Sequence, residues 1–321
     1  MASSSPASRR PLAEFFDRAG MLVVLAILFV VCSVGVENFF TWRNMESLAL
    51  AVSTIGMVAC TMLFCLAAGD FDLSVGSMVA CAGVVAAVVM AKTGSIALGT
   101  LAALGFGAAF GYANGHIVAR LKINALITTL ATMQIVRGLG LIVCDGKAVG
   151  IAQEGFFALG NSRLGGIPTP VWITATCFAG CGFILNRTVF GRDALAIGGN
   201  AEAAHLAGIA VERVKIAIFT AQGVMAAFAG VVLASRMTSG QPNVSQGFEL
   251  EVISACVLGG VSLTGGVGST AFVIAGVLIM GLVQNAMSLL NVPTFYQYVA
   301  RGLILLAAVL FDRWKRRQQP A

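Results

Sequence analysis

The feature that most constrains this chain is a series of long apolar segments separated only by short polar breaks. Of its 321 residues, 58% are hydrophobic and only 11% are charged, whereas a soluble domain carries roughly 25% charged residues. A helix needs about 20 apolar residues to cross the hydrocarbon of a bilayer, and no period-2 alternation indicates a β-barrel. The sequence therefore predicts an all-α polytopic membrane protein.

Hydropathy predicts about ten transmembrane helices. They lie at residues 19–36, 47–68, 74–91, 95–119, 124–143, 168–186, 214–234, 250–268, 270–291 and 296–311. The segments near 65–90 and 250–270 are the least sharply bounded, because their polar breaks could mark a broken helix. The chain accordingly divides into an N-terminal tail at 1–18, a transmembrane domain at 19–311 that includes a polar loop at 187–213, and a basic tail at 312–321.

Lysine and arginine are distributed unevenly between the two sides of this arrangement. An even number of spans puts both termini on one side, and most of the 20 Lys and Arg residues fall on that side. Because cytoplasmic loops are rich in Lys and Arg, both termini and the 187–213 loop are predicted to be cytoplasmic. The net charge of +6 follows from this bias and does not indicate a nucleic-acid partner.

The polar stretch RDALAIGGNAEAAHLAGIAVERVKI, residues 192–216, contains the signals of a short helix. Asn200 is a good N-cap after the flexible pair Gly198–Gly199, Glu202 suits the first turn, and Gly208 is a natural C-cap. The residues between them favour helix and are Ala201, Ala203, Ala204 and Leu206. The sequence predicts a helix of about two turns at 200–208.

Such a short helix is marginal in water, so something must hold it. Ala203 and Leu206 would share an apolar side. One interpretation places the helix at the membrane interface, with Arg192 and Arg213 near the phosphate headgroups. The other makes the helix a docking element for a cytoplasmic partner, and the residues alone favour neither.

Several polar residues fall within or beside apolar segments. Asp70 and Asp72 lie at a span boundary without a neighbouring Lys or Arg. An ionisable group at bilayer depth costs about 2.5–3.5 kcal/mol and is often functional, which would suit proton coupling. The favoured alternative is that they reach the cytoplasmic surface or cap helix ends. Further candidates for the translocation path or for interhelical contacts are Thr128, Gln134, Arg137, Asn285 and Arg301. Arg137 and Arg301 lie inside apolar runs, where each could either snorkel to the outer interface or pair with helix-end carbonyls.

The glycines and cysteines of the apolar segments indicate close helix packing and do not predict a metal site. Gly107, Gly111 and Gly115 share one helical face, which predicts a close helix–helix contact. Most of the eight cysteines lie in apolar segments, where free Cys packs as a small hydrophobe. Cys177 and Cys181 share a helix face, but no His or carboxylate joins them, so no metal site is predicted.

The chain shows no ATPase of its own. A phosphate-binding loop requires a Lys after its glycines, and the stretch GGVSLTGGVGS, from Gly259 to Ser269, has Gly266 at that place. No nucleophile–base pair indicates a membrane-embedded enzyme. The sequence therefore shows no catalytic machinery and no cofactor site, so any energy from ATP, with its Mg²⁺, would come through a partner.

Three stretches carry a family resemblance. FGRDALAIGGNAEAAHLAGI resembles the cytoplasmic coupling segment of ribose-type sugar permeases, which are the membrane subunits of bacterial ABC importers. CLAAGDFDLSVGS resembles the family's G-D-x-D-L-S-V-G signature, and CVLGGVSLTGGVGS its glycine-rich C-terminal signature. The likeness runs from about Met21 to Arg313 and departs mainly in the N-terminal tail and the 160–168 loop.

The resemblance implies two inverted halves, a fold of the type II ABC importer kind, and two permease copies around a central path. It also implies two cytoplasmic ATP-binding subunits, a periplasmic sugar-binding protein and a monosaccharide substrate. Of the pentoses, L-arabinose is the first candidate. Residues around Gly198 to Gly208 would form the coupling helix. The alternative function is an ion-coupled secondary sugar transporter that uses Asp70 and Asp72.

Overall fold

The computed structural model describes residues 10–317. Its helices are α1 (Arg10–Gly35), α2 (Trp42–Ala67), α3 (Val75–Thr93), α4 (Ile96–Ala119), α5 (Ala125–Val143), α6 (Glu154–Asn161), α7 (Thr169–Arg187), α8 (Val189–Gly199), α9 (Ala201–Leu206), α10 (Val211–Met237), α11 (Phe248–Leu258), α12 (Thr270–Leu289) and α13 (Thr294–Arg317). Its strands are β1 (Val149–Gly150), β2 (Arg163–Leu164), β3 (Ile167–Pro168) and β4 (Ser239–Gly240).

Within the described residues, 7 helices are long and apolar enough to cross a membrane: α2, α3, α4, α5, α7, α10 and α12. Two shorter apolar helical stretches lie at Gly20–Gly35 in α1 and Thr294–Leu310 in α13. The prediction of a polytopic all-α membrane protein is therefore confirmed.

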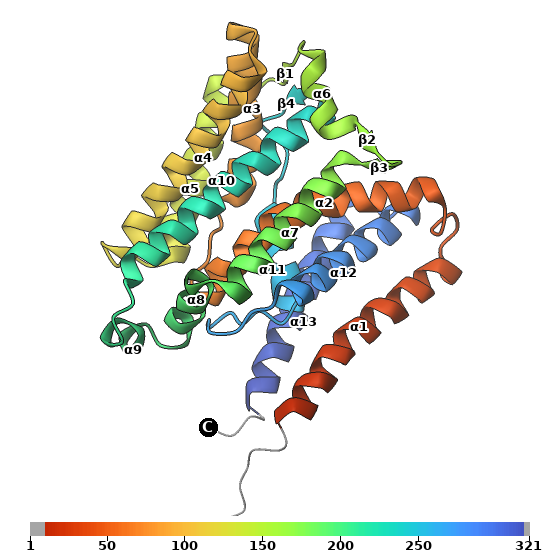
Figure 1. The fold of residues 1–321 in the computed structure, drawn as a ribbon. Helices are drawn as coiled ribbons and strands as arrows, with labels where there is room; N and C mark the ends of the chain where they lie inside the picture. The colour runs from red at the N-terminus through yellow and green to blue at the C-terminus, as the bar shows by residue number, and fades with distance from the viewer. Residues whose placement is uncertain (1–9, 318–321) are drawn as a thin grey trace, which may run out of the picture.

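The helices are arranged around α2 and α3. In the most hydrophobic windows of these two helices, 78% and 72% of the residues are buried. In Figure 1, α3, α4, α5 and α10 stand together, α1, α12 and α13 stand on the opposite side, and α2 and α7 lie between. α4, α5 and α7 leave most of their apolar surface exposed, as expected for helices that face lipid or another subunit.

The predicted glycine face forms the contact between α4 and α10. A Cβ on Gly107 would overlap the carbonyl oxygen of Gly223, and one on Gly115 would lie 2.8 Å from the Cα of Ile216. Gly111 packs against the backbone of Phe219 in the same way. Side chains larger than hydrogen would push the two backbones apart, so the prediction of close packing is confirmed.

The predicted span at 250–268 is wrong. α11 ends at Leu258, and residues 259–269 form an irregular loop. Gly260, Gly265 and Gly266 have positive φ values of 70°, 85° and 79°, which continuous right-handed helix does not allow. Hydropathy did not detect the break because glycine and the neighbouring valines are not polar.

The first and last helices extend beyond the predicted spans, because hydropathy detects only the apolar part of a helix. α1 begins at Arg10 and α13 continues to Arg317, so residues 10–18 and 312–317 are helical. Residues 1–9 and 318–321 lie outside the described residues.

Two small antiparallel pairs connect the helices at one end of the molecule. β1 pairs with β4, and β2 pairs with β3 through a two-residue turn. In that turn, Gly165 and Gly166 have φ values of 61° and 82°, as the favoured hairpin turn requires. Figure 1 shows these strands and α6 at the end of the molecule opposite to α9.

Candidate functional site

The predicted short helix is present as α9, and its caps are the predicted ones. The Asn200 side-chain oxygen accepts a hydrogen bond from the Ala203 backbone N–H at 2.9 Å. Gly208 follows the helix with a φ of 87° and donates its N–H to the carbonyl of His205. The sequence located this helix because a capping side chain and a left-handed glycine mark its two ends.

The interpretation of Gly198–Gly199 as a flexible pair is wrong. Both residues belong to the last turn of α8, a helix that the sequence did not predict. Ala194 and Ile197 bury the inner face of α8, which lies against α2, α7 and α10. Tertiary packing therefore holds α8 in place and makes it a firm support for α9.

The outer face of α9 is exposed in the described part of the chain. Leu206 is 82% exposed, and Ala203 and Glu202 are also exposed, whereas Ala204 is buried against the body of the protein. Figure 1 shows α9 at the tip of one corner of the molecule. The predicted apolar side formed by Ala203 and Leu206 is thus present and uncovered.

The end of α8 meets two other segments through a glycine junction, formed by Gly69, Gly198, Gly265 and Gly266. A Cβ on Gly198 would overlap the carbonyl oxygen of Ala67 at the end of α2, and one on Gly265 would lie 2.7 Å from the Gly198 Cα and 2.9 Å from the Gly69 N. Gly266 donates its N–H to the Ala67 carbonyl at 2.9 Å. The two glycine-rich stretches of the sequence therefore touch each other and the end of α2.

Asp70 has a cationic partner, contrary to the expectation that it has none nearby. The Lys215 Nζ, in the first turns of α10, lies 2.8 Å from the Asp70 Oδ2. The two residues are far apart in the sequence, and the loop between α7 and α10 brings them together. A carboxylate neutralised in this way loses the main reason for assigning it a proton-coupling role.

Asp72 binds Ser74, the residue directly before α3, which is close to the helix-end role of the favoured alternative. Its Oδ1 accepts hydrogen bonds from the Ser74 backbone N–H at 2.9 Å and from the Ser74 hydroxyl at 2.6 Å. The Asn114 amide donates to that hydroxyl at 3.2 Å, and the Thr132 hydroxyl donates to the Asn114 side-chain oxygen at 2.6 Å. The buried connection between α2 and α3 is thereby linked to α4 and α5.

Arg137 binds backbone carbonyls, one of the two roles the sequence left open. Its Nη1 donates to the carbonyl oxygens of Pro242 at 3.0 Å and Val244 at 2.8 Å. These residues belong to the irregular segment 241–247, which leads into α11. Non-helical backbone inside a membrane protein needs such partners.

Arg301 pairs with Glu251, which the sequence did not single out. The Arg301 Nη1 contacts the Glu251 carboxylate, and its guanidinium lies 5.4 Å from the centre of the Tyr298 ring. The ion pair joins the first turns of α11 to α13. A carboxylate inside an apolar segment was the signal that could have identified Glu251.

The other predicted polar residues do not converge on one site. Asn285 exchanges amide hydrogen bonds of 2.9 and 2.8 Å with Asn44, and so joins α12 to α2. Thr128 is buried and donates to the Asn124 carbonyl in its own helix. Gln134 is exposed on α5. Asn285 therefore acts as an interhelical contact, and the structure does not connect it with Thr128 or Gln134.

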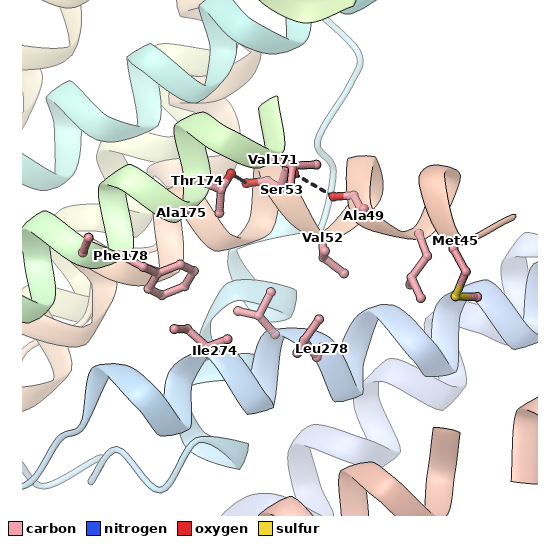
Figure 2. Close-up of a pocket in the computed structure, with 13 residues that line it drawn as sticks. Met45, Ala49, Val52, Ser53, Val171, Thr174, Ala175, Phe178, Ile274 and Leu278 are labelled. Atoms are coloured by element: carbon pink, nitrogen blue, oxygen red, sulfur yellow. Dashed lines mark hydrogen bonds between the residues drawn. The ribbon is translucent and has the colours of Figure 1, made fainter. Parts of the chain in front are cut away.

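A groove of about 560 Å³ lies between α2, α7 and α12. Figure 2 shows its labelled side chains, with Val52, Phe178, Ile274 and Leu278 toward the open space. Most of the lining is apolar, and the Thr174 hydroxyl already donates a hydrogen bond to the Ser53 carbonyl at 3.0 Å. The groove lacks the set of free polar groups that a sugar requires, and none of the predicted polar residues lines it.

The described cysteines and acidic residues form no metal centre. Among residues 20–310, whose side chains the structure describes, no group of three or more His, Cys, Asp or Glu side chains could hold a metal ion. Irregular backbone between the helices of a membrane bundle, stabilised by buried polar contacts, is typical of transporters. The fold and site thus define a polytopic helical membrane protein of the transporter class.

Comparison with known proteins narrows this class. Residues 44–309 match the family model described as "Branched-chain amino acid transport system / permease component". The chain therefore belongs to this family of permeases. As a permease component it is a transport subunit and not itself an enzyme, as predicted.

Named relatives cover nearly the whole chain. It is 59% identical over 315 residues to the L-arabinose transport system permease protein AraH of Escherichia coli K12, covering 98% of this chain and 96% of that protein. It is 53% identical over 308 residues to the L-arabinose ABC transporter permease protein AraH of Azospirillum brasilense, covering 96% and 91%. It is 36% identical over 301 residues to the ribose import permease protein RbsC of Escherichia coli K12, covering 92% and 93%. No solved structure matches the chain.

These relatives confirm the resemblance to sugar permeases of ABC importers. They are bacterial proteins, and the chain is a multi-pass membrane permease of an ABC transporter.

Proposed function

We propose that this chain is the membrane subunit of an ATP-driven importer that carries L-arabinose into the cytoplasm. The observation that supports the sugar is the 59% identity to an L-arabinose permease over 98% of the chain, against 36% to a ribose permease. The observation that supports ATP coupling is the capped α9 helix with its uncovered Leu206.

The proposed assembly contains two copies of this chain, two cytoplasmic ATP-binding subunits that hold ATP and Mg²⁺, and a periplasmic sugar-binding protein. The chain is built from two inverted halves, lies in the bacterial inner membrane and has both termini in the cytoplasm. The excess of Lys and Arg on the side of the 187–213 loop supports this orientation. The chain itself holds no cofactor.

Within this assembly, residues 187–213 form the coupling loop and Gly198 to Gly208 its contact with the ATPase. An apolar helix face exposed to water suits a groove in a partner, and the firm support from α8 lets a push on α9 reach the membrane helices.

Uptake of labelled L-arabinose tests the substrate. Cells that lack this chain should take up little sugar, and restoring the chain together with its partner subunits should restore uptake. Unlabelled L-arabinose should compete, whereas leucine, chosen because the family description names branched-chain amino acids, should not. Restored leucine uptake without L-arabinose uptake would contradict the proposed substrate.

A charge on α9 tests the coupling contact. Leu206→Asp should abolish co-purification of the ATP-binding subunits, because a carboxylate would be buried in an apolar groove. Leu164→Asp is the matched control: Leu164 is also exposed, at 66%, but lies in β2 near the opposite end of the molecule. Equal co-purification of both variants would rule out α9 as the docking helix.

A further inference from the structure

The connection between α2 and α3, residues 68–74, lies between the two flanks of the coupling loop. On one flank, the glycine junction presses Gly198 of α8 against the end of α2. On the other flank, Lys215 reaches Asp70 from the start of α10. The loop that carries α9 is therefore attached to the same connection before and after the exposed helix.

The Asp70–Lys215 ion pair is largely protected from water, unlike the Arg120–Glu212 ion pair, which also involves the first turns of α10. The exposed fractions of the Asp70 and Lys215 side chains are 11% and 19%. The Arg120–Glu212 pair lies 3.7 Å apart with exposed fractions of 54% and 57%. Exposed pairs contribute about 0–1 kcal/mol, whereas removing one partner of a buried pair leaves an uncompensated charge and is strongly destabilising.

Asp70 is joined through the backbone of Phe71 to a set of polar contacts that leads away from the coupling loop. Two residues beyond it, Asp72 holds Ser74 at the start of α3. Ser74 accepts from Asn114 in α4, which in turn accepts from Thr132 in α5. A displacement of residues 68–74 therefore changes the position of α3 and strains its contacts with α4 and α5.

We propose that Asp70 and Lys215 are positioning residues for transport, whose ion pair transmits movement of α9 and the start of α10 to the connection between α2 and α3. Lys215 lies in the second turn of α10, nine residues after α9 ends at Leu206, so a displacement of α9 that carries the start of α10 moves its ammonium group. The pair then draws the 68–74 connection, and with it the start of α3, along with α10. This inference rests on the proposed role of α9 as the contact with the ATPase.

Charge reversal and exchange test the pair. Lys215→Glu places two carboxylates together and should lower L-arabinose uptake by at least about tenfold, because a buried pair is broken. The ATP-binding subunits should still co-purify and hydrolyse ATP, since α9 is unchanged, so more ATP is consumed per sugar. The exchanged variant Asp70→Lys/Lys215→Glu should recover uptake to within about fivefold of the original chain, because a close charge pair is restored.

Two further variants keep the test decisive. Arg120→Glu, in the exposed pair, should change uptake by less than about twofold. Lys215→Met removes the charge without adding repulsion and should lower uptake while ATP hydrolysis continues. If the exchanged variant does not insert, Lys215→Met decides the outcome.

The proposal is overturned if Lys215→Glu transports normally, or if uptake and ATP hydrolysis fall in equal proportion in Lys215→Met. It is also overturned if the exchanged variant inserts normally and transports no better than Lys215→Glu. Failure of the proposed coupling role gives a different pattern, in which Leu206→Asp retains its ATP-binding subunits.

Discussion

Arg137 supplies hydrogen-bond donors to the segment 241–247. This segment connects helices but is not helical, so its carbonyls lack the regular backbone partners of a helix. The Arg137 guanidinium donates to two carbonyls of that segment, a geometry that a planar group with five N–H donors can satisfy. The sequence offered this role as one of two, but could not select it, because the acceptors lie 105 and 107 residues away.

Replacing Arg137 should therefore destabilise the protein. In Arg137→Met, each carbonyl left without a donor should lower the free energy of unfolding by about 1–3 kcal/mol. Thermal unfolding in detergent measures this effect as a lower Tm. Gln134→Ala, one turn away and exposed, should leave the Tm unchanged, and similar losses in both variants would contradict the assigned role of Arg137.

Gly198 and Gly199 are neighbours, but only Gly199 has room for a larger side chain. A Cβ on Gly198 would overlap the Ala67 carbonyl oxygen, whereas one on Gly199 would meet no atom within 4 Å. Gly198→Ala should separate α8 from α2 and reduce uptake severely, because overpacking costs about 1–3 kcal/mol at the base of the coupling helix. Gly199→Ala should transport normally. A transport assay that finds the two variants alike would argue against the glycine junction.

The polar residues that the sequence predicted best are those whose partners are local. Asn200 and Asp72 bond to atoms two or three residues away, so capping rules identify them. Lys215 and Glu251 were missed because their partners come from distant parts of the chain, and no periodicity or spacing reports such contacts. Asp70 was misjudged for the same reason.

At the scale of elements, hydropathy located the long helices well and the interrupted ones badly. α4 and α7 begin and end within a residue or two of the predicted bounds, because a continuous apolar run defines them. α11 is only 11 residues long, since the glycines after it favour a turn without lowering the hydropathy. α8 was missed because it is stabilised by its contacts with α2 and α7.

The contact of α4 with α10 gives an element-scale prediction. Gly107→Ala should destabilise this pair by about 1–3 kcal/mol through overpacking, because its Cβ would overlap the Gly223 carbonyl. Gly105→Ala, on the open face of the same helix, has no atom within 4 Å of its Cβ and should be neutral. Thermal unfolding in detergent, measured as the Tm of each variant, compares the two substitutions. Equal Tm values would show that the two helices tolerate separation.

At the scale of the whole molecule, the account joins three parts. In the proposed mechanism, α9 receives a push from the ATPase, the Asp70–Lys215 pair and the glycine junction pass it to the end of α2, and the polar contacts from Asp72 to Thr132 distribute it to α3, α4 and α5. Local capping signals in the sequence located the α9 helix, and the family resemblance gave its coupling role. Sequence reasoning could not give the second part, because the two glycine-rich stretches and the ion pair meet only through the fold.

The most direct test of this account is L-arabinose entry into proteoliposomes that contain the chain with its ATP-binding subunits, with sugar-binding protein outside. We predict that sugar accumulates when ATP is enclosed, and does so equally with or without a proton gradient. Accumulation driven by a proton gradient in the absence of ATP would contradict the account and return the transport role to Asp70 and Asp72.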